Sequence, residues 1–562
     1  MKIPKDPVER QHLYDELTRQ CLASRQERFD FYRVARNYYL FGTPDESGAA
    51  YNKVGSTIET LSSFIYAPDA VRFSIHLGTS ADESDIHKVM PLSREISEQW
   101  RMSGTHLRFG VGAKWALVFG IMLMKVQWRR GVARTYLVEP HQFGVLREDI
   151  MDLTDQEAFA MCYTTTKTQL YADLFGNPRR EAIMAKVGKG GGEGSGTFTG
   201  GLSRLMLANP VSGVPGSLAQ QSGAIGGAGG TLQDGLSGGG AQYSYAPKVE
   251  AELIDMCDLY VWDDDTEDYQ IVSMASPSVV IYDRPQKVVG VAGMPHFAVI
   301  RPELNLYDYF WGDSFAAKLA WLQNWRSEDV WNIRSLQAKQ ADPPISATGM
   351  GGIAEEKLAA LRRAGGRLSF PAPTSKVEMH PPKMPENAFG SLKEIDAMFD
   401  DTAGIGHILQ GKGESGVRSK GQADLMARLG SSRPKARATV VEESAEDVAT
   451  LMLRNIQEHS DQRFTSQPPD GAKKLTFTAS QFTKDYEVKV DAHSSSPIFV
   501  EDRKHDAVTM LEARVIDRST FLTMYDPPNE QLLQERLKVI EIKEAQAQQA
   551  QMAAEAKQKG GG

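Results

Sequence analysis

One glycine-rich run has the residue types and spacing of a phosphate-binding loop. Gly406, Gly411 and Lys412 match the pattern G-x-x-x-x-G-K-[ST], in which backbone amides and a lysine hold phosphate. Gly413 stands where the pattern requires a hydroxyl ligand for Mg²⁺, and the preceding residues SLKEIDAMFDD predict a helix where the motif needs a strand. A nucleotide-dependent nucleic-acid enzyme that uses the Gly406–Lys412 loop is therefore the alternative interpretation of this sequence.

The other candidate groups are more typical of structure than of catalysis. The acidic runs 263–265 and 400–401 fit solvated turns better than a metal or acid/base pair, because adjacent carboxylates point in different directions. The eleven histidines show no H-E-x-x-H or zinc spacing, and no G-x-S-x-G turn is present. Trp321, Trp325 and Trp331 have helical spacing, which favours core positions over base stacking. We expect no enzymatic activity, no metal site and no cofactor.

Composition indicates a folded protein with several cores. The 562 residues are 41% hydrophobic and 24% charged, which are ordinary values for such a chain. Cys21, Cys162 and Cys257 are odd in number and far apart in sequence, so we expect neither a disulfide framework nor a thiolate metal cage. Without a signal-peptide core or a run of about 18 apolar residues, we also expect no secretion and no membrane partner.

Charge is distributed unevenly along the chain. The 63 basic and 72 acidic residues give a net charge of −9, which is the wrong sign for a protein that coats nucleic acid with its whole surface. Between Gly411 and Arg437, however, seven basic residues outnumber two acidic ones. We therefore expect a local basic region within an acidic molecule.

Hydrophobic periodicity predicts that helices precede strands over the first 300 residues. Helices are predicted at 8–41, as one long helix or two short ones, at 58–66, and as two further helices over 87–120. Strands are predicted for a hairpin with Gly131 at its turn and for 157–165, 279–283 and 297–300. From Gly188 to Gly240, 19 of the 50 glycines occur in 53 residues without apolar periodicity. This composition predicts a flexible insertion within a strand-rich domain.

The second half of the chain predicts long helices around short excursions. Helices are expected at 313–340 and 391–404, then over 420–459 with a break near Pro434, and strands in KLTFT and YEVKVD. The last 65 residues read as helical. Two helices therefore bracket a compact proline-rich and glycine-rich segment.

This order of parts resembles the portal, or head-to-tail connector, proteins of tailed double-stranded DNA bacteriophages, most closely those of short-tailed phages. The matching stretches include YNKVGSTIETLSSFIYAPDAVRFSIH, WALVFGIMLMKV, DSFAAKLAWLQNWRSEDVWNIRSLQAKQ and IGHILQGKGESGVRSKGQ. The resemblance implies an α+β portal-type fold with a mixed α/β wing, a helical stem, a small clip and a helical C-terminal crown. The implied parts are the wing 1–310 with the insertion 188–240, first stem helix 311–341, clip 342–385, second stem helix 386–403, tunnel loop 404–420, kinked long helix with returning wing strands 421–498, and crown with C-terminal tail 499–562.

The same resemblance implies a non-enzymatic function. Portal proteins form a closed dodecameric ring at one capsid vertex, at the head-tail junction of the virion, after assembly in the cytoplasm of the host bacterium. Double-stranded DNA passes through their channel during packaging and ejection. The implied partners are the large subunit of the terminase, which hydrolyses the ATP, together with the major capsid, scaffold and tail adaptor proteins.

Two groups of site residues follow from the resemblance. The tunnel-loop residues expected to line the DNA channel are His407, Lys412, Arg418 and Lys420. The clip residues expected to contact terminase and adaptors are Arg362, Arg363 and Arg367. A ring through which DNA slides must avoid many tight phosphate contacts, since each adds salt-dependent affinity. The acidic net charge is compatible with such a channel.

Overall fold

A computed structural model describes most of the chain. It covers 2–187, 253–348, 376–405, 432–466, 475–490, 507–525, 533, 536–537, 540 and 543, with short gaps at 27, 46–47, 50, 69–70, 80–82, 276–278, 304–308, 342, 344, 386, 514 and 517. Helices and sheets are mixed, and every strand pair in these ranges is antiparallel. The mixture of helices and strands that the periodicity predicts is therefore confirmed, and the fold class is α+β.

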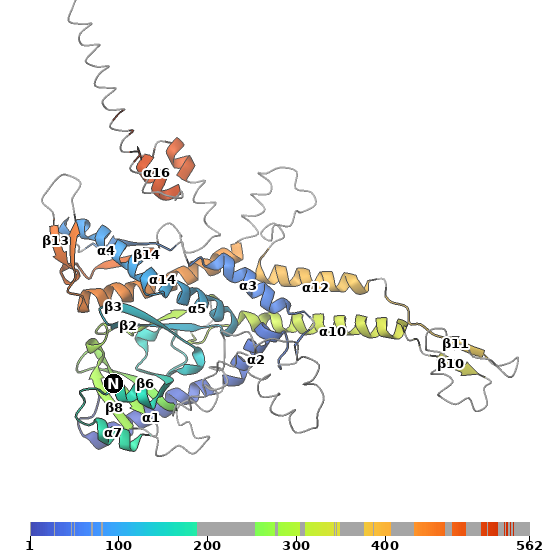
Figure 1. Ribbon diagram of the computed structural model, residues 1–562, viewed down its shortest axis with the longest axis horizontal. Helices are drawn as coiled ribbons and strands as arrows, with labels where there is room; N and C mark the ends of the chain where they lie inside the picture. The colour runs from blue at the N-terminus through green and yellow to red at the C-terminus, as the bar shows by residue number, and fades with distance from the viewer. Residues whose placement is uncertain are drawn as a thin grey trace, which may run out of the picture.

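The molecule consists of a thick body and a narrow stalk that projects from one end of it (Figure 1). The helices of the body are α1 (Pro7–Gln26), α2 (Phe29–Phe41), α3 (Lys53–Ile65), α4 (Glu83–Met102), α5 (Thr105–Phe119), α6 (Lys167–Asp173), α7 (Arg180–Lys186) and α14 (Ser432–His459). The predicted segment 8–41 is thus two helices. Gly42 ends α2 in the left-handed conformation at φ 73°, and the Asn52 side chain caps α3 by accepting a hydrogen bond from Gly55 N at 2.9 Å.

A five-stranded meander forms one layer of the body. Its strands are β4 (Phe143–Val145), β5 (Ala158–Thr166), β6 (Leu253–Asp263), β7 (Asp268–Ala275) and β8 (Val279–Pro285). Strands β6 and β7 escape the periodicity analysis because both of their faces are buried, which removes the alternation of apolar and polar residues. β5 and β6 pair along nine residues. The insertion predicted from Gly188 to Gly240 lies outside the described residues and falls in the chain between α7 and β6.

A three-stranded sheet packs between this meander and the helices. It consists of β2 (Met122–Arg129) at the centre, flanked by β3 (Val132–Val138) and β9 (Phe297–Ile300). The predicted hairpin is confirmed, with Gly131 at φ 78° in its turn. Alternate β2 residues point to opposite cores: Met122 and Met124 contact the helices, whereas Leu123 contacts the meander. Helix α1 covers the far face of the meander.

Segments from the second half of the chain complete the core that the first half begins. Strand β14 (Tyr486–Val490) pairs with β1 (Phe73–Leu77), and β12 (Arg463–Ser466) pairs with β13 (Leu475–Thr478). Helix α14 buries Val441, Ala445, Val448 and Met452 in the core that it shares with α3, β2 and β14, which confirms the predicted helical spacing. Strands β1 and β12 are additional to the prediction. A short helix, α16 (Arg518–Tyr525), lies beyond β14.

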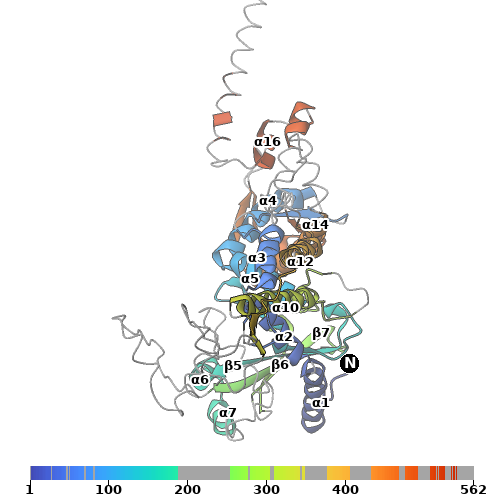
Figure 2. The same ribbon diagram turned by 90° about the vertical axis from the view of Figure 1, so that its right-hand side faces the viewer.

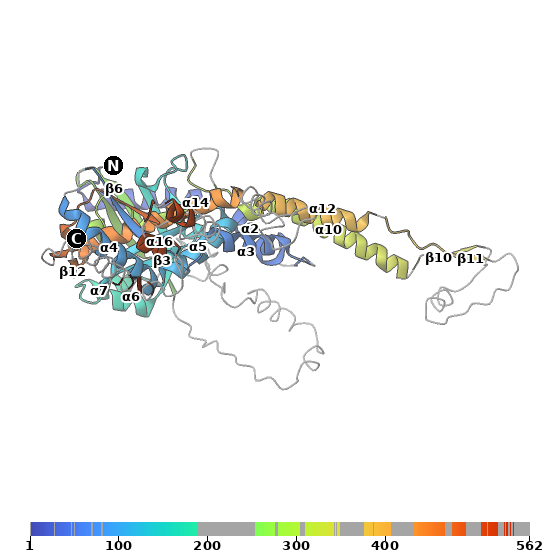
Figure 3. The same ribbon diagram turned by 90° about the horizontal axis from the view of Figure 1, so that it is seen from above.

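The stalk is a pair of adjacent helices that ends in a small sheet. Helices α10 (Phe315–Ala341) and α12 (Ala388–Ala403) run side by side away from the body, and β10 (Ile345–Thr348) pairs with β11 (Lys376–Met379) at the far tip (Figures 1 and 3). The 27 residues of α10 span roughly 40 Å. Figure 2, which looks along the stalk, places both helices in front of the body.

Candidate functional site

Contacts between α3 and α10 fix the stalk to the body. The Gln323 side chain is fully buried; it accepts a hydrogen bond from Lys53 N at 3.0 Å and donates one to Tyr51 O at 3.1 Å. Lys53 Nζ also reaches Asp400 Oδ1 of α12 at 3.5 Å. These polar contacts hold both stalk helices against one end of α3. The acidic pair 400–401 is therefore not the expected solvated turn, because Asp400 lies on α12 and its side chain is only 12% exposed in this ion pair.

Farther out, polar contacts join the two stalk helices to each other. Arg326 Nε donates to Asp396 Oδ1 at 2.9 Å, and its guanidinium lies 4.7 Å from the centre of the Tyr51 ring. Ser391 Oγ donates to an Asp329 carboxylate oxygen. Beyond Gln323, Ile333 is the only described residue of α10 that is buried. The outer stalk therefore has little apolar core within a single chain.

Three tryptophans of α10 are exposed. The exposed fractions are 57% for Trp321, 42% for Trp325 and 68% for Trp331. Trp321 and Trp325 stack with ring centres 6.3 Å apart. The prediction that helical spacing places them in the core is wrong, because the tryptophans lie on the face of α10 opposite the one that buries Leu319 and Leu322. Apolar residues at helical spacing are as typical of a surface that another molecule covers as they are of a core.

The predicted clip arginines follow the sheet at the tip. Arg362, Arg363 and Arg367 lie outside the described residues, in the segment between β10 and β11. Thr348 pairs with Lys376, so this segment leaves the tip and returns to it. The assignment of these arginines stays a prediction. The structure describes the two strands, β10 and β11, between which their segment lies in the chain.

The predicted tunnel-loop residues belong to a segment whose two ends meet. His407, Lys412, Arg418 and Lys420 all lie outside the described residues, after α12 and before α14. Arg433 Nη1 donates to Asp401 O at 2.7 Å. Basic groups that bond the last carbonyls of a helix also complement its dipole. The first turn of α14 therefore caps α12, as the next contacts also indicate.

Arg437 makes the strongest connection at this junction. Its Nη1 donates to Ala403 O at 2.9 Å, its Nε is paired with Glu303, and its guanidinium lies 4.7 Å from the centre of the Phe315 ring. Glu303 also accepts from Lys318 Nζ at 3.2 Å. We call Arg433, Arg437 and Glu303 the arginine junction. It joins the end of α12 and the beginning of α14 to the beginning of α10.

The element before Gly406 bears on the alternative interpretation of this loop. A phosphate loop follows a β-strand, whereas α12 runs to Ala403 and ends at Gly404 with φ 73°. The acid-ending run Leu259–Asp263 does lie on a strand, β6, but precedes the loop in the chain. The described flanks therefore lack the strand-loop order that nucleotide binding requires.

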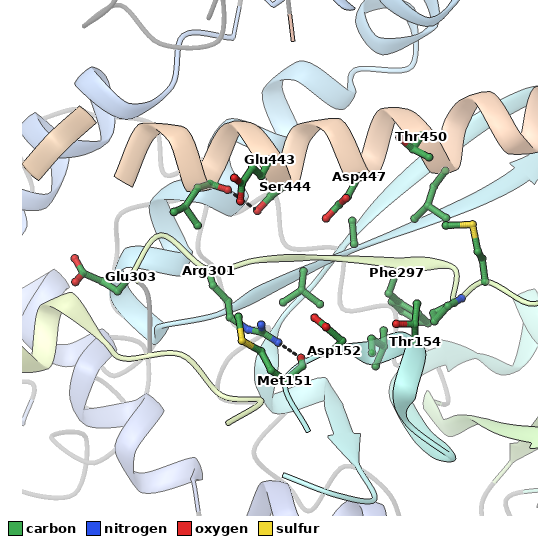
Figure 4. A pocket seen from close by; sticks show the side chains of 17 residues that line it. Met151, Asp152, Thr154, Phe297, Arg301, Glu303, Glu443, Ser444, Asp447 and Thr450 are labelled. Carbon is green, nitrogen blue, oxygen red and sulfur yellow. Dashed lines mark hydrogen bonds between the residues drawn. The ribbon is translucent and has the colours of Figure 1, made fainter. Parts of the chain in front are cut away.

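An acidic cleft lies between α14 and the segments around β9 (Figure 4). It has a volume of about 330 Å³, and Asp152, Glu443 and Asp447 line it together with Arg301. Burial, and then repulsion from Glu446, Glu443 and Asp152, raises the pKa of Asp447 to about 6. Burial lowers the pKa of Arg301 to about 10, and its Nη2 donates to Met151 O at 2.6 Å.

The sequence pattern alone does not reveal this cleft, although part of its signal is local. Glu443 and Asp447 are four residues apart on α14, where like charges repel along one helix face. Asp152 belongs to a turn almost 300 residues earlier, and only the fold brings it to the cleft. The local signal for the cleft is this pair of like charges on a helix that packs against a core.

The three cysteines converge in space. Cys162 lies opposite Cys257 in the β5–β6 pair, and Cys21 of α1 joins the same buried cluster. All three remain thiols. Burial, followed by the neighbouring Cys162, raises the pKa of Cys21 to about 12, which keeps this thiol protonated and unreactive. Separation in sequence therefore does not mean separation in the fold.

Comparisons with known proteins add no family to these observations. No protein-family model matches the chain, and no curated protein matches it. The described ranges contain no group of three or more histidine, cysteine, aspartate or glutamate side chains that could hold a metal ion. No helix among the described residues is long and apolar enough to span a membrane.

Proposed function

We propose that this chain is a phage portal protein: a closed ring at one capsid vertex that conducts DNA during packaging and ejection. The ring would also be the docking platform for terminase and for tail or adaptor proteins. The observation that carries the proposal is the two-helix stalk, which projects from the body and carries exposed tryptophans on α10.

Neighbouring molecules would stabilise the stalk by covering its exposed apolar side chains. Two helices with few shared apolar contacts are marginal in water, because helix stability in proteins comes mostly from packing. Beyond Gln323, α10 buries Ile333 alone among its described residues, while Trp321, Trp325 and Trp331 remain exposed. Copies of the chain arranged around an axis would cover these surfaces, and in a closed ring every copy has the same two neighbours.

The order of elements along the chain supports the same proposal. A mixed body is followed by α10, a distal segment bounded by β10 and β11, α12, a segment bounded by the arginine junction, and α14, which returns across the body. Portal proteins have this order of wing, stem, clip, second stem helix, tunnel loop and returning helix. By this correspondence the clip meets terminase and adaptors.

The charge distribution is compatible with a DNA channel. The net charge is −9, yet seven basic residues outnumber two acidic ones between Gly411 and Arg437. Arg433 and Arg437 of this group are engaged at the arginine junction. A few remaining cations would contact phosphates briefly, without the strong affinity that would slow DNA movement.

Particle size and shape test this proposal. The full-length protein should sediment as a large closed oligomer at micromolar concentration, and negative-stain images along the axis should show rings with a central hole. Capsid scaffold protein should promote assembly where the isolated chain assembles slowly. Only monomers or dimers, with scaffold protein also failing to give rings, would remove the main support for a portal.

A further inference from the structure

A second cavity, separate from the acidic cleft, lies between the two sheets. It has a volume of about 560 Å³, within the range of small-molecule sites. Strands β2, β3, β5, β6, β7 and β8 and helix α6 contribute to its wall. Leu170, Met256 and Ile281 provide apolar surface, while Tyr136 and Tyr163 add phenol groups. The cavity therefore combines an apolar wall with hydrogen-bonding groups.

The cations of this cavity outnumber its carboxylates. Lys125, Arg129 and Arg284 line it together with Asp173 and Asp258. The Asp258 carboxylate already accepts three hydrogen bonds, from Lys125 Nζ at 3.3 Å, from Ser273 Oγ at 2.7 Å and from Tyr163 OH at 3.4 Å. Asp173 lies 4.0 Å from Arg129, and both side chains are about half exposed. Neither carboxylate thus neutralises Arg284.

Arg284 has no counterpart for its charge in the described part of the chain. This half-buried side chain forms no ion pair there, and its buried Nε has no hydrogen-bond partner. Its guanidinium lies 4.9 Å from the centre of the Tyr282 ring, which orients it on the cavity wall. A partly buried guanidinium without an acceptor is costly, and a ligand that supplies anionic oxygens removes that cost.

The surroundings report the same positive potential. Burial, and then the charges of Lys125 and Arg284, holds the pKa of His296 well below its usual value. Burial would lower the pKa of Lys125, but Tyr260 and Asp258 reverse this effect and raise it. Lys125 therefore stays charged between the sheets.

We propose that this cavity binds a small organic anion, with Arg284 and Arg129 holding a phosphate or carboxylate group and Leu170, Met256 and Ile281 contacting an apolar body. The arginines present planar N–H groups that match either oxyanion.

Isothermal titration calorimetry with phenyl phosphate and benzoate tests the site in the full-length protein. The wild type should bind one of them at least tenfold more tightly than Arg284→Gln does, because a charge-assisted hydrogen bond accounts for at least that factor. Arg129→Gln should weaken binding less, and Arg284→Lys should restore part of it. Arg179→Gln, which removes an exposed arginine outside the cavity, is the matched control and should bind normally.

The results show which class of anion binds, or that the site binds no anion. Tighter phenyl phosphate binding assigns a phosphate ligand, and tighter benzoate binding assigns a carboxylate. The proposal is overturned by no binding of either probe at millimolar concentration, or by equal binding to wild type and Arg284→Gln. Unfolding of both Arg284 variants would give this arginine a structural role and would also overturn it.

Discussion

The guanidinium of Arg437 donates a hydrogen bond to the carbonyl oxygen of Ala403 at 2.9 Å, so that the beginning of α14 caps the end of α12. Both helices are long, and the segment between them carries the predicted DNA contacts. This segment therefore begins and ends at one fixed place beside the first turn of α10, where Glu303 pairs with Arg437.

Removing Arg437 should destabilise the protein more than removing Arg433. The Arg437→Ala change leaves Glu303, whose side chain is 14% exposed, with Lys318 as its remaining basic partner, and it removes the contact with Phe315. We expect a loss of about 2–3 kcal/mol for a largely buried pair of this kind. Arg433→Ala removes one exposed hydrogen bond and should cost about 1 kcal/mol or less.

Urea unfolding followed by tryptophan fluorescence measures both changes. Arg437→Lys is the informative control, because lysine keeps the charge but not the several N–H directions of the guanidinium. It should be intermediate between the wild type and Arg437→Ala. Equal and small effects of all three substitutions would show that the arginine junction contributes little to stability.

The exposed tryptophans should matter for assembly and not for folding of the chain. Trp321→Glu combined with Trp325→Glu changes two exposed side chains, so far-UV circular dichroism should stay unchanged. The ring population in sedimentation should fall strongly, because charge would replace apolar surface between copies. Phe175→Glu, an 85% exposed apolar residue of the body, is the matched control and should leave rings intact. Normal rings in the double variant would remove this face of α10 from the proposed interface.

Asp447 should make the folded state less stable as pH rises from about 4 to about 6. Its pKa in the folded protein is about 6, against an ordinary value of 3.8, so the native state binds this proton more tightly than the unfolded chain. The stabilising effect of protonation is complete below pH 4 and is lost as pH passes through 6. Asp447→Asn should therefore raise the melting temperature at pH 7.5 and change it little at pH 4.

Thermal melts across this pH range check the prediction. Glu98→Gln removes one negative charge from an exposed position on α4 and should change stability by a similar small amount at both pH values. A stabilisation by Asp447→Asn that is equal at pH 4 and pH 7.5 would contradict the raised pKa. It would point instead to packing of the amide in the acidic cleft.

The sequence predicts those elements whose signal is local. The β2–β3 hairpin follows from apolar strands around Gly131, and α10, α12 and α14 follow from helical spacing. Strand β6 is missed because burial on both faces gives it a continuous apolar run, such as that from Leu259 to Trp262. Trp321 is misplaced because periodicity identifies an apolar helix face without telling what covers it. Local pattern thus predicts elements better than surfaces.

The candidate sites depend on contacts between distant parts of the chain. Asp152 meets Glu443 and Asp447 only because α14 returns across the body, and Lys125 meets Asp258 only because two sheets pack face to face. Neither arrangement has a fixed spacing along the chain. Sequence reasoning can therefore nominate charged residues but cannot pair them without the topology.

Replacing residues 188–240 with a short Gly/Ser linker should preserve the fold. The described elements at its borders are held independently: β5 and β6 pair along nine residues, and Leu170, Leu174 and Ile183 of the α6–α7 region are buried in one cluster. The replaced segment lacks the apolar periodicity needed for a core. The deletion variant should be soluble and form rings, with a melting temperature within a few degrees of the wild type. Insoluble protein, or a much lower melting temperature, would show that the segment is structural.

ATP binding distinguishes a tunnel loop from a phosphate loop. If Lys412 held the terminal phosphates of a nucleotide, Lys412→Ala would abolish ATP binding. The helix α12 before Gly406 and the glycine at position 413 instead favour a loop that contacts passing DNA. We therefore expect no measurable ATP binding by the isolated protein, as checked by calorimetry. Micromolar ATP affinity that Lys412→Ala removes would restore the enzyme interpretation.

In assembled heads, the same loop should act through its charge. Arg418→Glu with Lys420→Glu should keep the rings, since neither residue is part of the arginine junction, but should impair packaging or retention of DNA by repelling phosphates. Lys412→Ala should have a weaker effect of the same kind, because it removes one cation without adding an anion. Lys2→Glu with Lys5→Glu makes the same charge change at the N-terminus and should package normally. DNA protected from nuclease per head measures the result, and full protection in the Arg418→Glu, Lys420→Glu double variant would exclude these residues as DNA contacts.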